Sequence, residues 1–593
     1  MQTSAEKLKA LRNQIKAAGL NGFIVPRADE YQGEFVAPYA ERLKWLTGFT
    51  GSAGTAVVLE DKACILTDGR YLLQIAQEID AGLFEIVDIT KTPLEKWLAE
   101  NVGEQDVIGY DPWLHTPDQL EKLRTAGASL RSVEGNLLDQ IWADQPARPQ
   151  EPAYLFPQHF AGRSTTDKIG EVRAVLRESK ASACIIGLPD SVNWLLNVRG
   201  GDVKCTPLVL SYAIVQADED KPVQWIVESE KIPSEVNAVL KGIVEILPPS
   251  SMSQTLKTLA GQGAVALDFK RCPAAFKEML EAGGAEIKDI TDPCIRPKAL
   301  KTPQEQEAIC AAHIADGVAL VKFLHWLDTS DEPLDEVKID EVLTAFRARH
   351  PDFKGASFPT IAGFAANGAV IHYRARPETA RRIEGDSLLL IDSGAQYLGE
   401  NLAGTTDITR TIAIGTPSQE MKERFTDVLK GHIALAMAHF PEGTTGAQLD
   451  TLARAPLWNM GLDYAHGTGH GVGCYLAVHE DAASLSPRGT MALEEGMLLS
   501  NEPGYYKAEG YGIRIENLVL VKKTEVCADT GKQMLCFETV SLAPIDHRLI
   551  ISEALDAQEA AWLGEYHKRV YKTLMPYLDE KESVWLKSVT KSA

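Results

Sequence analysis

A pattern that occurs twice between residues 302 and 516 constrains the fold more than any other feature of the sequence. Each copy opens with a helix-start signal, Thr302-Pro-Gln-Glu305 and then Thr416-Pro-Ser-Gln419. In both, the threonine is expected to cap a helix and the Glu or Gln to close a capping box. Two helical patterns follow, then a histidine-bearing loop, then two strands that each carry an acid. The acids are Asp392 and Asp407 in the first copy and Glu502 and Glu516 in the second.

The spacings agree between the two copies. The first acid lies 90 residues after Thr302 in one copy and 86 residues after Thr416 in the other, and the paired acids are 15 and 14 residues apart. Two halves related by a pseudo-two-fold axis would direct both pairs of carboxylates into one cleft. Four carboxylates cannot all stay ionised at close range without compensating positive charge. Two divalent metal ions, bound by bridging carboxylates and one imidazole, would supply that charge.

The imidazole is expected from a glycine-rich stretch, Ala465-His-Gly-Thr-Gly-His-Gly-Val-Gly473, and from the residues that follow it. Imidazole is the commonest metal ligand in proteins. A single histidine in a loop is more often structural, and each acid alone could be a turn residue or a strand end. Their matched positions in two halves favour a metal site instead. The histidines of this region are His466, His470 and His479, and the corresponding loop of the first copy carries His372.

The first 300 residues contain a second repeat. In each copy, apolar residues at helical spacing precede a strand, a tryptophan, a glycine cluster and a further strand, which we predict at residues 55–59 and 207–211. This order predicts two related α/β domains. The proline-rich stretch 146–157 is typical of a linker between them. We therefore predict three domains, residues 1–152, 153–298 and 299–593, the last ending in a tail of amphipathic helices from residue 551.

Chain length and composition argue against a single-core fold and against several classes of function. A chain of 593 residues is too long for a single core. Its formal net charge of −22 argues against binding nucleic acid or an anionic membrane surface. Nine cysteines without a C-x-x-C pair indicate a reducing compartment. The N-terminus lacks the apolar region of a signal peptide, and no stretch approaches the ~20 apolar residues that span a bilayer. We expect a cytoplasmic protein.

Five motifs in this order resemble those of the M24 metallopeptidases of the pita-bread fold, in particular the long, three-domain aminopeptidase P group of the cytosolic type. The resemblance covers essentially the whole chain. It implies an α/β (α+β) fold with two creatinase-like α/β domains followed by a pita-bread domain. The motifs are Asp392-Ser-Gly-Ala-Gln-Tyr397, Gly404-Thr-Thr-Asp-Ile-Thr-Arg-Thr411, His466-Gly-Thr-Gly-His-Gly-Val-Gly473, Asn501-Glu-Pro-Gly-Tyr-Tyr506 and Gly512-Ile-Arg-Ile-Glu-Asn517.

The resemblance also implies an activity and a set of site residues. The activity is hydrolysis of the N-terminal Xaa-Pro bond of peptides with proline at the second position, by a homodimer with two divalent ions. Manganese is expected, with zinc or cobalt as alternatives. The implied ligands are Asp392, Asp407, His470, Glu502 and Glu516. The histidines implied at the substrate site, with catalytic roles, are His372, His466 and His479, and Tyr506 and Arg514 are placed nearby.

A mechanism follows as a hypothesis. A water bridging the two ions would lose its proton to Glu502 acting as general base. His372 or His479 would hydrogen-bond the developing oxyanion. The leaving nitrogen belongs to proline and lacks an N–H group, so it needs a dedicated pocket. Arg514 shares strand parity with Glu516 and can face the same side, although it could equally pair with a structural carboxylate.

One departure and three alternatives accompany this interpretation. Residues 398–403 carry about four extra residues relative to the family pattern, an insertion that costs little as a hairpin tip. A prolidase, which cleaves only Xaa-Pro dipeptides, is disfavoured by the additional N-terminal domain. A metal-free creatinase-like enzyme is disfavoured by the complete ligand set. A non-catalytic pita-bread module for peptide binding or chaperoning need not keep five ligands.

Overall fold

The computed structural model describes residues 2–125 and 127–591; residues 1 and 592–593, at the outer ends of the first and third predicted domains, lie outside the described residues. Contacts divide the chain into two compact units. Unit 1 comprises Met1–Gln158 and Arg163–Ile295, and unit 2 comprises His159–Gly162 and Arg296–Ala593. The domain boundaries at residues 152 and 298 stay predictions.

The first sheet of unit 1 has the strand order β4-β3-β2-β1-β5-β6. Helix α1 (Ser4–Ala17) begins with a capping box at Thr3 and buries the apolar face that its spacing predicted. The strands are β1 (Gly22–Pro26), β2 (Thr55–Leu59), β3 (Ala63–Thr67), β4 (Glu85–Asp88), β5 (Val107–Tyr110) and β6 (Ser129–Ser132). The remaining helices are α2 (Arg42–Thr47), α3 (Leu72–Glu78), α4 (Leu94–Asn101) and α5 (Pro117–Arg124).

The second sheet of unit 1 repeats the first strand for strand, in the order β12-β11-β10-β8-β13-β14. The pairing senses also match, since β1 and β8 each pair antiparallel with one neighbour and parallel with the other. The predicted repeat is therefore confirmed. The strands are β8 (Ala183–Ile186), β10 (Tyr212–Gln216), β11 (Val223–Ile226), β12 (Val244–Leu247), β13 (Val265–Leu267) and β14 (Ile287–Asp289). The helices are α7 (Thr165–Ser179), α8 (Pro189–Leu196), α9 (Ser234–Leu240), α10 (Met252–Ala260) and α11 (Ala274–Ala282).

The strand predicted at residues 207–211 is wrong, because β10 begins at Tyr212. The buried amide of Asn193 takes the place of a neighbouring strand at this point. Its Oδ1 accepts a hydrogen bond from the backbone N–H of Val209 at 3.0 Å, and its Nδ2 donates to the carbonyl of Val209 at 2.9 Å. Residues 207–211 are buried without forming a strand, because side-chain contacts decide the conformation of such a run more than its composition does.

The first capping signal of unit 2 predicted the start of its helix correctly. The second helix begins two residues later than its signal predicted. Thr302 and Glu305 form the expected capping box at the start of α13 (Pro303–Thr329). Helix α15 (Gln419–Ala436) is capped by Ser418, not Thr416, whose backbone N–H donates to Asp386 instead. The other helices are α12 (Ile295–Ala299), α14 (Glu336–Arg347), α16 (Gly446–Trp458), α17 (Ala557–Leu574) and α18 (Glu580–Val589).

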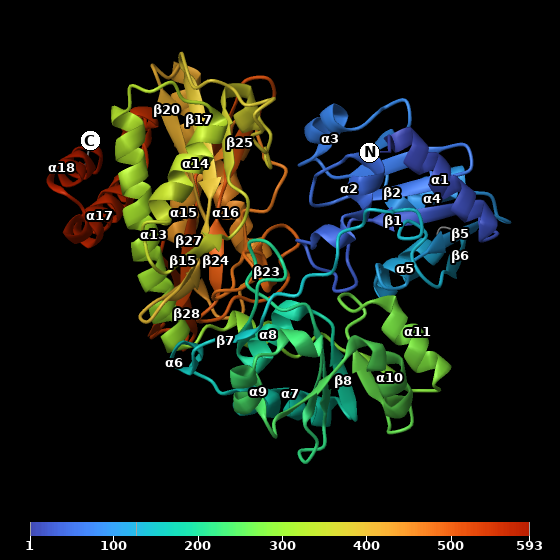
Figure 1. Ribbon diagram of the computed structural model, residues 1–593. Coiled ribbons are helices and arrows are strands. Elements are labelled where there is room, and N and C mark those ends of the chain that lie inside the picture. Colours follow the sequence, from blue (N-terminus) through green and yellow to red (C-terminus); the bar gives the residue numbers. More distant parts are fainter. Residues whose placement is uncertain (1, 126, 592–593) are drawn as a thin grey trace. The chain divides into compact units, whose positions relative to one another are not determined.

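The strands of unit 2 form two main sheets with smaller ones beside them. One main sheet has the order β16-β17-β20 and the other β21-β28-β27-β24-β22-β23; β17 and β20 lie side by side (Figure 1). The first half contributes β15 (Phe353–Ala356), β16 (Ile361–Phe364), β17 (Ser387–Ser393), β18 (Ala395–Leu398), β19 (Ala403–Thr405) and β20 (Ile408–Ile414). The second contributes β21 (His439–Pro441), β22 (Gly469–Gly471), β23 (Glu480–Leu485), β24 (Leu498–Asn501), β25 (Gly504–Lys507), β26 (Tyr511–Arg514), β27 (Asn517–Val526) and β28 (Gln533–Thr539).

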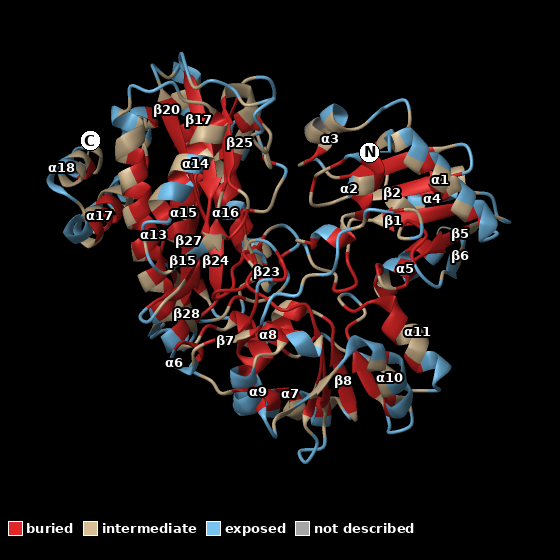
Figure 2. Cartoon of the chain, in the orientation of Figure 1, coloured by how far each residue is buried: buried red, intermediate tan, exposed pale blue. Residues whose placement is uncertain are grey.

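One helix corrects the expectation that no stretch could span a bilayer. Helix α13 is long enough and apolar enough by composition, with a mean hydropathy of 1.4 in its best window. More than half of that window is buried, and α13 packs against α14, α17, α18 and β19. The central strands of unit 2 are likewise buried (Figure 2). Burial of this kind is typical of the core helix of a globular domain.

Candidate metal centre and active site

The four acids lie at strand ends of the two main sheets of unit 2. Asp392 is the last but one residue of β17, and Asp407 immediately precedes β20. Glu502 immediately follows β24, and Glu516 immediately precedes β27. Since Asn501 and Asn517 are cross-strand partners, the two glutamates flank a single rung of the β24–β27 ladder.

These side chains converge on one place. Ligand atoms of Asp407, His470 and Glu516 all lie within 4.8 Å of one another. The Nε2 atom of His470 is 3.5 Å from Asp407 Oδ2 and 3.5 Å from Glu502 Oε1. Asp392 is close enough for its charge to raise the pKa of Glu516. The structure thus brings together all five residues that the resemblance implied as ligands.

Burial and the charges of neighbouring carboxylates raise the pKa of three of these acids. Burial is the main cause for Asp392, Glu502 and Glu516, and the charge of Asp407 adds to it in each case. Burial alone would lower the pKa of His470. The hydrogen bond to Asp407 and the charges of Glu502 and Asp407 outweigh burial and raise that pKa to about 9. The cluster carries more negative charge than its surroundings offset, which is the environment that a divalent cation would stabilise.

The donor atoms fit such a cation. Asp392 Oδ2 accepts from Arg514 Nη2 at 2.7 Å, whereas Asp392 Oδ1 is buried and has no hydrogen-bond partner among the described residues. His470 Nδ1 lies 2.9 Å from the carbonyl of Gly471, so Nδ1 carries a proton, and Nε2, which faces the acids, would exchange its own proton for a bound cation. Carboxylate oxygens with one imidazole suit divalent ions of the manganese and zinc type.

Each half of unit 2 orients an acid of the other half. Arg514, on β26 of the second half, forms the ion pair with Asp392 of the first. Thr409, on β20 of the first half, donates from Oγ1 to Glu516 Oε2 of the second at 2.6 Å. The backbone N–H of Glu516 also donates to the carbonyl of Thr409 at 3.2 Å. The relative placement of the acids therefore depends on contacts between the two halves.

A hydrogen-bond chain runs from Arg514 to His466. Arg514 Nη1 donates to the hydroxyl oxygen of Tyr506 at 2.6 Å. His466 Nδ1 lies 2.8 Å from the carbonyl of Gly467, so this nitrogen carries the proton and Nε2 accepts from the Tyr506 hydroxyl, 2.8 Å away. Burial raises the pKa of Tyr506 to about 12 and keeps its hydroxyl protonated. Tyr506 and Arg514, both predicted from the resemblance, lie beside the acids.

The remaining predicted histidines also lie at this site or beside it. The ring of His479 contacts that of His470 edge to face, with centroids 4.3 Å apart. His372 lies in the loop after the 3-10 turn η4 (Ala365–Ala369). The carbonyl of Ile371, its neighbour in sequence, lies 3.5 Å from Arg514 Nη2. This loop therefore borders the Arg514 guanidinium.

Residues 398–403, where the sequence predicts an insertion, connect the two strands of a hairpin. Strands β18 and β19 pair antiparallel, with Gln396 opposite Thr405. The backbone N–H of Gly399 closes the turn by donating to the carbonyl of Leu402 at 2.9 Å. The hairpin returns the chain to Asp407 two residues after the end of β19, and Asp407 lies in the cluster.

Two supporting residues were missed by the sequence reasoning. Thr409 lies two positions after Asp407, so strand parity could have placed both on one face. Ser500 accepts from the backbone N–H of His470 at 2.9 Å and donates to Glu502 Oε1 at 3.2 Å, joining two ligands. Its position two residues before Glu502 is the corresponding signal.

Comparisons with known proteins agree with this geometry. The model of metallopeptidase family M24 matches residues 307–523, and a model for the C-terminal region of peptidase M24 matches residues 533–593. Two models of the creatinase/prolidase N-terminal domain match residues 7–141 and 144–305. These matches and the repeated sheets of unit 1 bear out the predicted fold class.

Full-length relatives extend the match. The chain is 36% identical to "Probable Xaa-Pro aminopeptidase P" of Paracoccidioides brasiliensis and 37% identical to the protein of that name from Pyricularia oryzae, each over 99% of both chains. A crystal structure of X-prolyl aminopeptidase from Caenorhabditis elegans, described as a cytosolic enzyme with a di-nuclear active site, superimposes with a TM-score of 0.93 at 32% identity over 100% of both chains. The chain therefore belongs to metallopeptidase family M24, within its three-domain aminopeptidase P group.

Proposed function

We propose that the chain is a metal-dependent aminopeptidase that hydrolyses the N-terminal Xaa-Pro bond of peptides. The observation that carries this proposal is the convergence of four carboxylates and one imidazole, from both halves of unit 2, in a chain similar to Xaa-Pro aminopeptidases over its whole length. The substrate class is a peptide with proline at its second position.

The five converging side chains are proposed to hold two divalent ions, with manganese as the preferred metal. Two such metal ions, when bound, lower the pKa of water and polarise a carbonyl oxygen. Arg514 holds Asp392, Thr409 holds Glu516 and Ser500 holds Glu502, so each carboxylate keeps an oriented oxygen. The proposed ligands are Asp392, Asp407, His470, Glu502 and Glu516.

Glu502 is proposed as the general base that takes the proton of the attacking water. Its burial raises its pKa, which moves its basicity towards that required near neutral pH. The Ser500 hydroxyl orients Oε1, and His466 Nδ1 lies 3.9 Å from Oε2. His466 is in turn held by Tyr506, so the base and its neighbours form one connected set.

His372 and His479 are proposed to hydrogen-bond the substrate carbonyl oxygen as negative charge develops on it. His479 meets the ring of the ligand His470, and the loop of His372 borders Arg514. Tyr506 and Arg514 are proposed as part of the wall beside the proline ring. The hydrogen bond between them fixes both side chains without any contact to a substrate N–H group. Proline offers no such N–H group.

A cleavage assay on the purified protein tests the proposed function. The tetrapeptide Ala-Pro-Ala-Ala should release free alanine, whereas Ala-Ala-Ala-Ala should not, and a chelator should abolish the release. The dipeptide Ala-Pro separates the enzyme from a prolidase, which would cleave the dipeptide and leave the tetrapeptide intact. Absence of bound metal together with absence of cleavage would support a non-catalytic pita-bread module.

The role of His372 has its own test. His372→Ala should lower turnover while the protein retains its bound metal, because the residue is proposed to act on the substrate. Metal content measured by elemental analysis and turnover measured on Ala-Pro-Ala-Ala distinguish the roles. Loss of metal in this variant would make His372 part of the metal site instead.

A cytoplasmic homodimer is proposed as the working form. The related enzyme from Caenorhabditis elegans is described as cytosolic, which supports the location. Nine cysteines, with no disulfide among the described residues, also suit a reducing compartment. Light scattering coupled to size-exclusion chromatography tests the assembly, since a particle of one chain mass would contradict the dimer.

A further inference from the structure

A buried histidine behind the metal site connects the two strands that carry the glutamates. His432, on α15, is fully buried, as are Asn501 at the end of β24 and Asn517 at the start of β27. Its Nδ1 lies 3.1 Å from the carbonyl oxygen of Asn501, and its Nε2 lies 3.0 Å from Nδ2 of Asn517. Asn501 returns a hydrogen bond from its own Nδ2 to the carbonyl of His432 at 2.9 Å.

The surrounding contacts determine which atoms donate. Asn517 Oδ1 accepts from Arg410 Nη2 at 2.9 Å and from the Tyr566 hydroxyl at 3.2 Å, so the amide nitrogen of Asn517 must face His432. The amide donates to Nε2, and Nδ1 carries the only ring proton, which it donates to Asn501. A second ring proton would meet the Asn517 N–H and the Arg410 charge. Burial and Arg410 accordingly lower the pKa of His432 to about 3.

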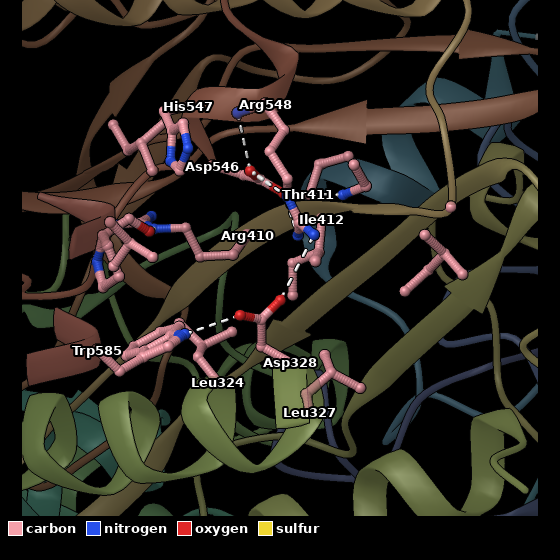
Figure 3. A pocket seen from close by; sticks show the side chains of 16 residues that line it. Leu324, Leu327, Asp328, Arg410, Thr411, Ile412, Asp546, His547, Arg548 and Trp585 are labelled. Atoms are coloured by element: carbon pink, nitrogen blue, oxygen red, sulfur yellow. Dashed lines mark hydrogen bonds and ion pairs between the residues drawn. The ribbon is translucent and has the colours of Figure 1, made fainter. Parts of the chain in front are cut away.

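Arg410 closes the same network on the other side. Its Nη1 donates to the carbonyl of Glu516 at 2.7 Å and to that of Thr409 at 2.9 Å. Arg410 also lines a cavity of about 270 Å³ that includes Trp585 of the C-terminal helix α18 (Figure 3). None of the five proposed metal ligands is among the described residues that line this cavity.

We propose that His432 is a positioning residue that fixes the Asn501–Asn517 rung and thereby sets the places of Glu502 and Glu516. These asparagines are cross-strand partners, and each is the direct chain neighbour of one glutamate. A ring that bonds both asparagines prevents the rung from shearing, which would separate the two carboxylates. Residues that orient ligands in this way typically change metal affinity about 10–100-fold when replaced.

The matched control is His567 on α17, a second buried neutral histidine in unit 2. Its Nε2 accepts from the backbone N–H of Ile545 at 3.1 Å, and burial and Arg410 lower its pKa to about 4. It resembles His432 in burial, charge state and proximity to Arg410. Its hydrogen bond with Ile545, however, involves neither of the strands next to Glu502 and Glu516. A purely structural contribution would therefore be similar in both positions.

The test compares three variants of the full chain, His432→Leu, His432→Gln and His567→Leu. Mn²⁺ affinity is measured by calorimetry on metal-stripped protein, and turnover and KM are measured on Ala-Pro-Ala-Ala at saturating Mn²⁺. His432→Leu should bind Mn²⁺ about 10–100-fold more weakly and lower kcat with little change in KM. His432→Gln retains one donor and one acceptor and should recover most of the affinity. His567→Leu should leave the affinity unchanged.

Two results would overturn the inference: wild-type Mn²⁺ affinity in folded His432→Leu, or an equal loss of affinity in His567→Leu. If His432→Leu does not fold, Asn517→Ala replaces it, because this change removes one of the two ring contacts; wild-type affinity there has the same consequence. The inference rests on the proposed function for its kinetic part only. A wild-type chain that binds Mn²⁺ without cleaving the peptide would refute the activity and leave the affinity test intact.

Discussion

The two halves of unit 2 place equivalent acids on unequal sheets. The first half carries Asp392 and Asp407 on a three-stranded sheet, and the second carries Glu502 and Glu516 on a six-stranded sheet. The hairpin β18–β19 precedes Asp407 in the first half, whereas β22 carries the proposed ligand His470 in the second. In both halves the acids lie at strand ends. The number of strands in each sheet can therefore differ while the acids keep equivalent positions.

The halves also differ in how they hold each other's acids. The second half contributes a charged partner, Arg514, to Asp392, while the first contributes a neutral hydroxyl, Thr409, to Glu516. Removing the charged partner of a buried carboxylate lowers the free energy of unfolding more than removing a hydroxyl partner does. The reciprocal contacts are therefore unequal in strength, and mutations can measure the inequality.

The largest effect should come from removing a ligand at the junction of the halves. Asp407→Asn should lower both the metal content and the turnover on Ala-Pro-Ala-Ala, the latter by at least about 100-fold, because the change removes a ligand and not merely a supporting contact. Elemental analysis and kinetics on the same preparation provide the measurement. Full activity with a normal metal content would remove Asp407 from the site.

A smaller effect is expected from the charged contact. Arg514→Met leaves Asp392 buried beside three other acids without its guanidinium partner. The free energy of unfolding of the metal-stripped protein should fall by about 3 kcal/mol, the usual cost of breaking a buried ion pair. Denaturant unfolding measures the change. An unchanged free energy of unfolding would show that buried Asp392 does not need the Arg514 guanidinium.

Buried histidines on α13 and α15 allow us to compare how two positions make the stability of the protein depend on pH. His432 on α15 has a pKa of about 3 in the folded chain and about 6.5 when unfolded, so only the unfolded state gains the proton between these values. Stability from this residue is therefore complete above pH 6.5 and lost as pH falls. The loss should reach about 2 kcal/mol at pH 5. Urea unfolding of wild type and His432→Gln at pH 7 and pH 5 measures the difference.

The corresponding buried histidine of α13, His313, provides the contrast. Burial also lowers its pKa, and its Nδ1 lies 2.9 Å from the carbonyl of Ile309 within its own helix. His313→Gln should reduce the acid sensitivity in the same direction while leaving Mn²⁺ affinity less affected than His432→Leu does. Equal losses of affinity from the two helices would show that the halves are supported alike.

The smallest effect is expected from the neutral contact. Thr409→Val preserves the shape of the side chain and removes the hydroxyl that donates to Glu516 at 2.6 Å. The free energy of unfolding should fall by about 1 kcal/mol. Comparison with Arg514→Met under identical conditions gives the ratio of the two contacts. A loss as large as that of Arg514→Met would contradict the inferred inequality.

The sequence was most informative where a pattern recurs. Similar spacings located all four acids because, in both halves, two long helices precede the strands at whose ends the acids lie. The capping box at Thr302 was predicted correctly since its partners lie three residues apart. The second helix start was not, because Ser418 competes with Thr416 and a distant residue, Asp386, binds the Thr416 backbone. Local signals fail where a tertiary contact decides between two candidates.

Contacts between elements were beyond the sequence. Nothing near His432 in the chain indicates that it meets Asn501 and Asn517, which lie 69 and 85 residues away. The strand predicted at residues 207–211 failed for a similar reason, since the Asn193 side chain occupies its backbone groups. Pattern and spacing predict which elements form, whereas folding decides which side chains they bring together.

The rung between Asn501 and Asn517 makes this part of the chain intolerant of changes in length. Side chains alternate between the two faces of a strand, so inserting or deleting one residue within β24 or β27 would turn a glutamate from the cluster to the opposite face. The turn between β18 and β19, by contrast, connects two paired strands and lies outside the acid-bearing ladder. A change of length costs little in such a turn, whereas the two strands next to the glutamates must keep their number of residues.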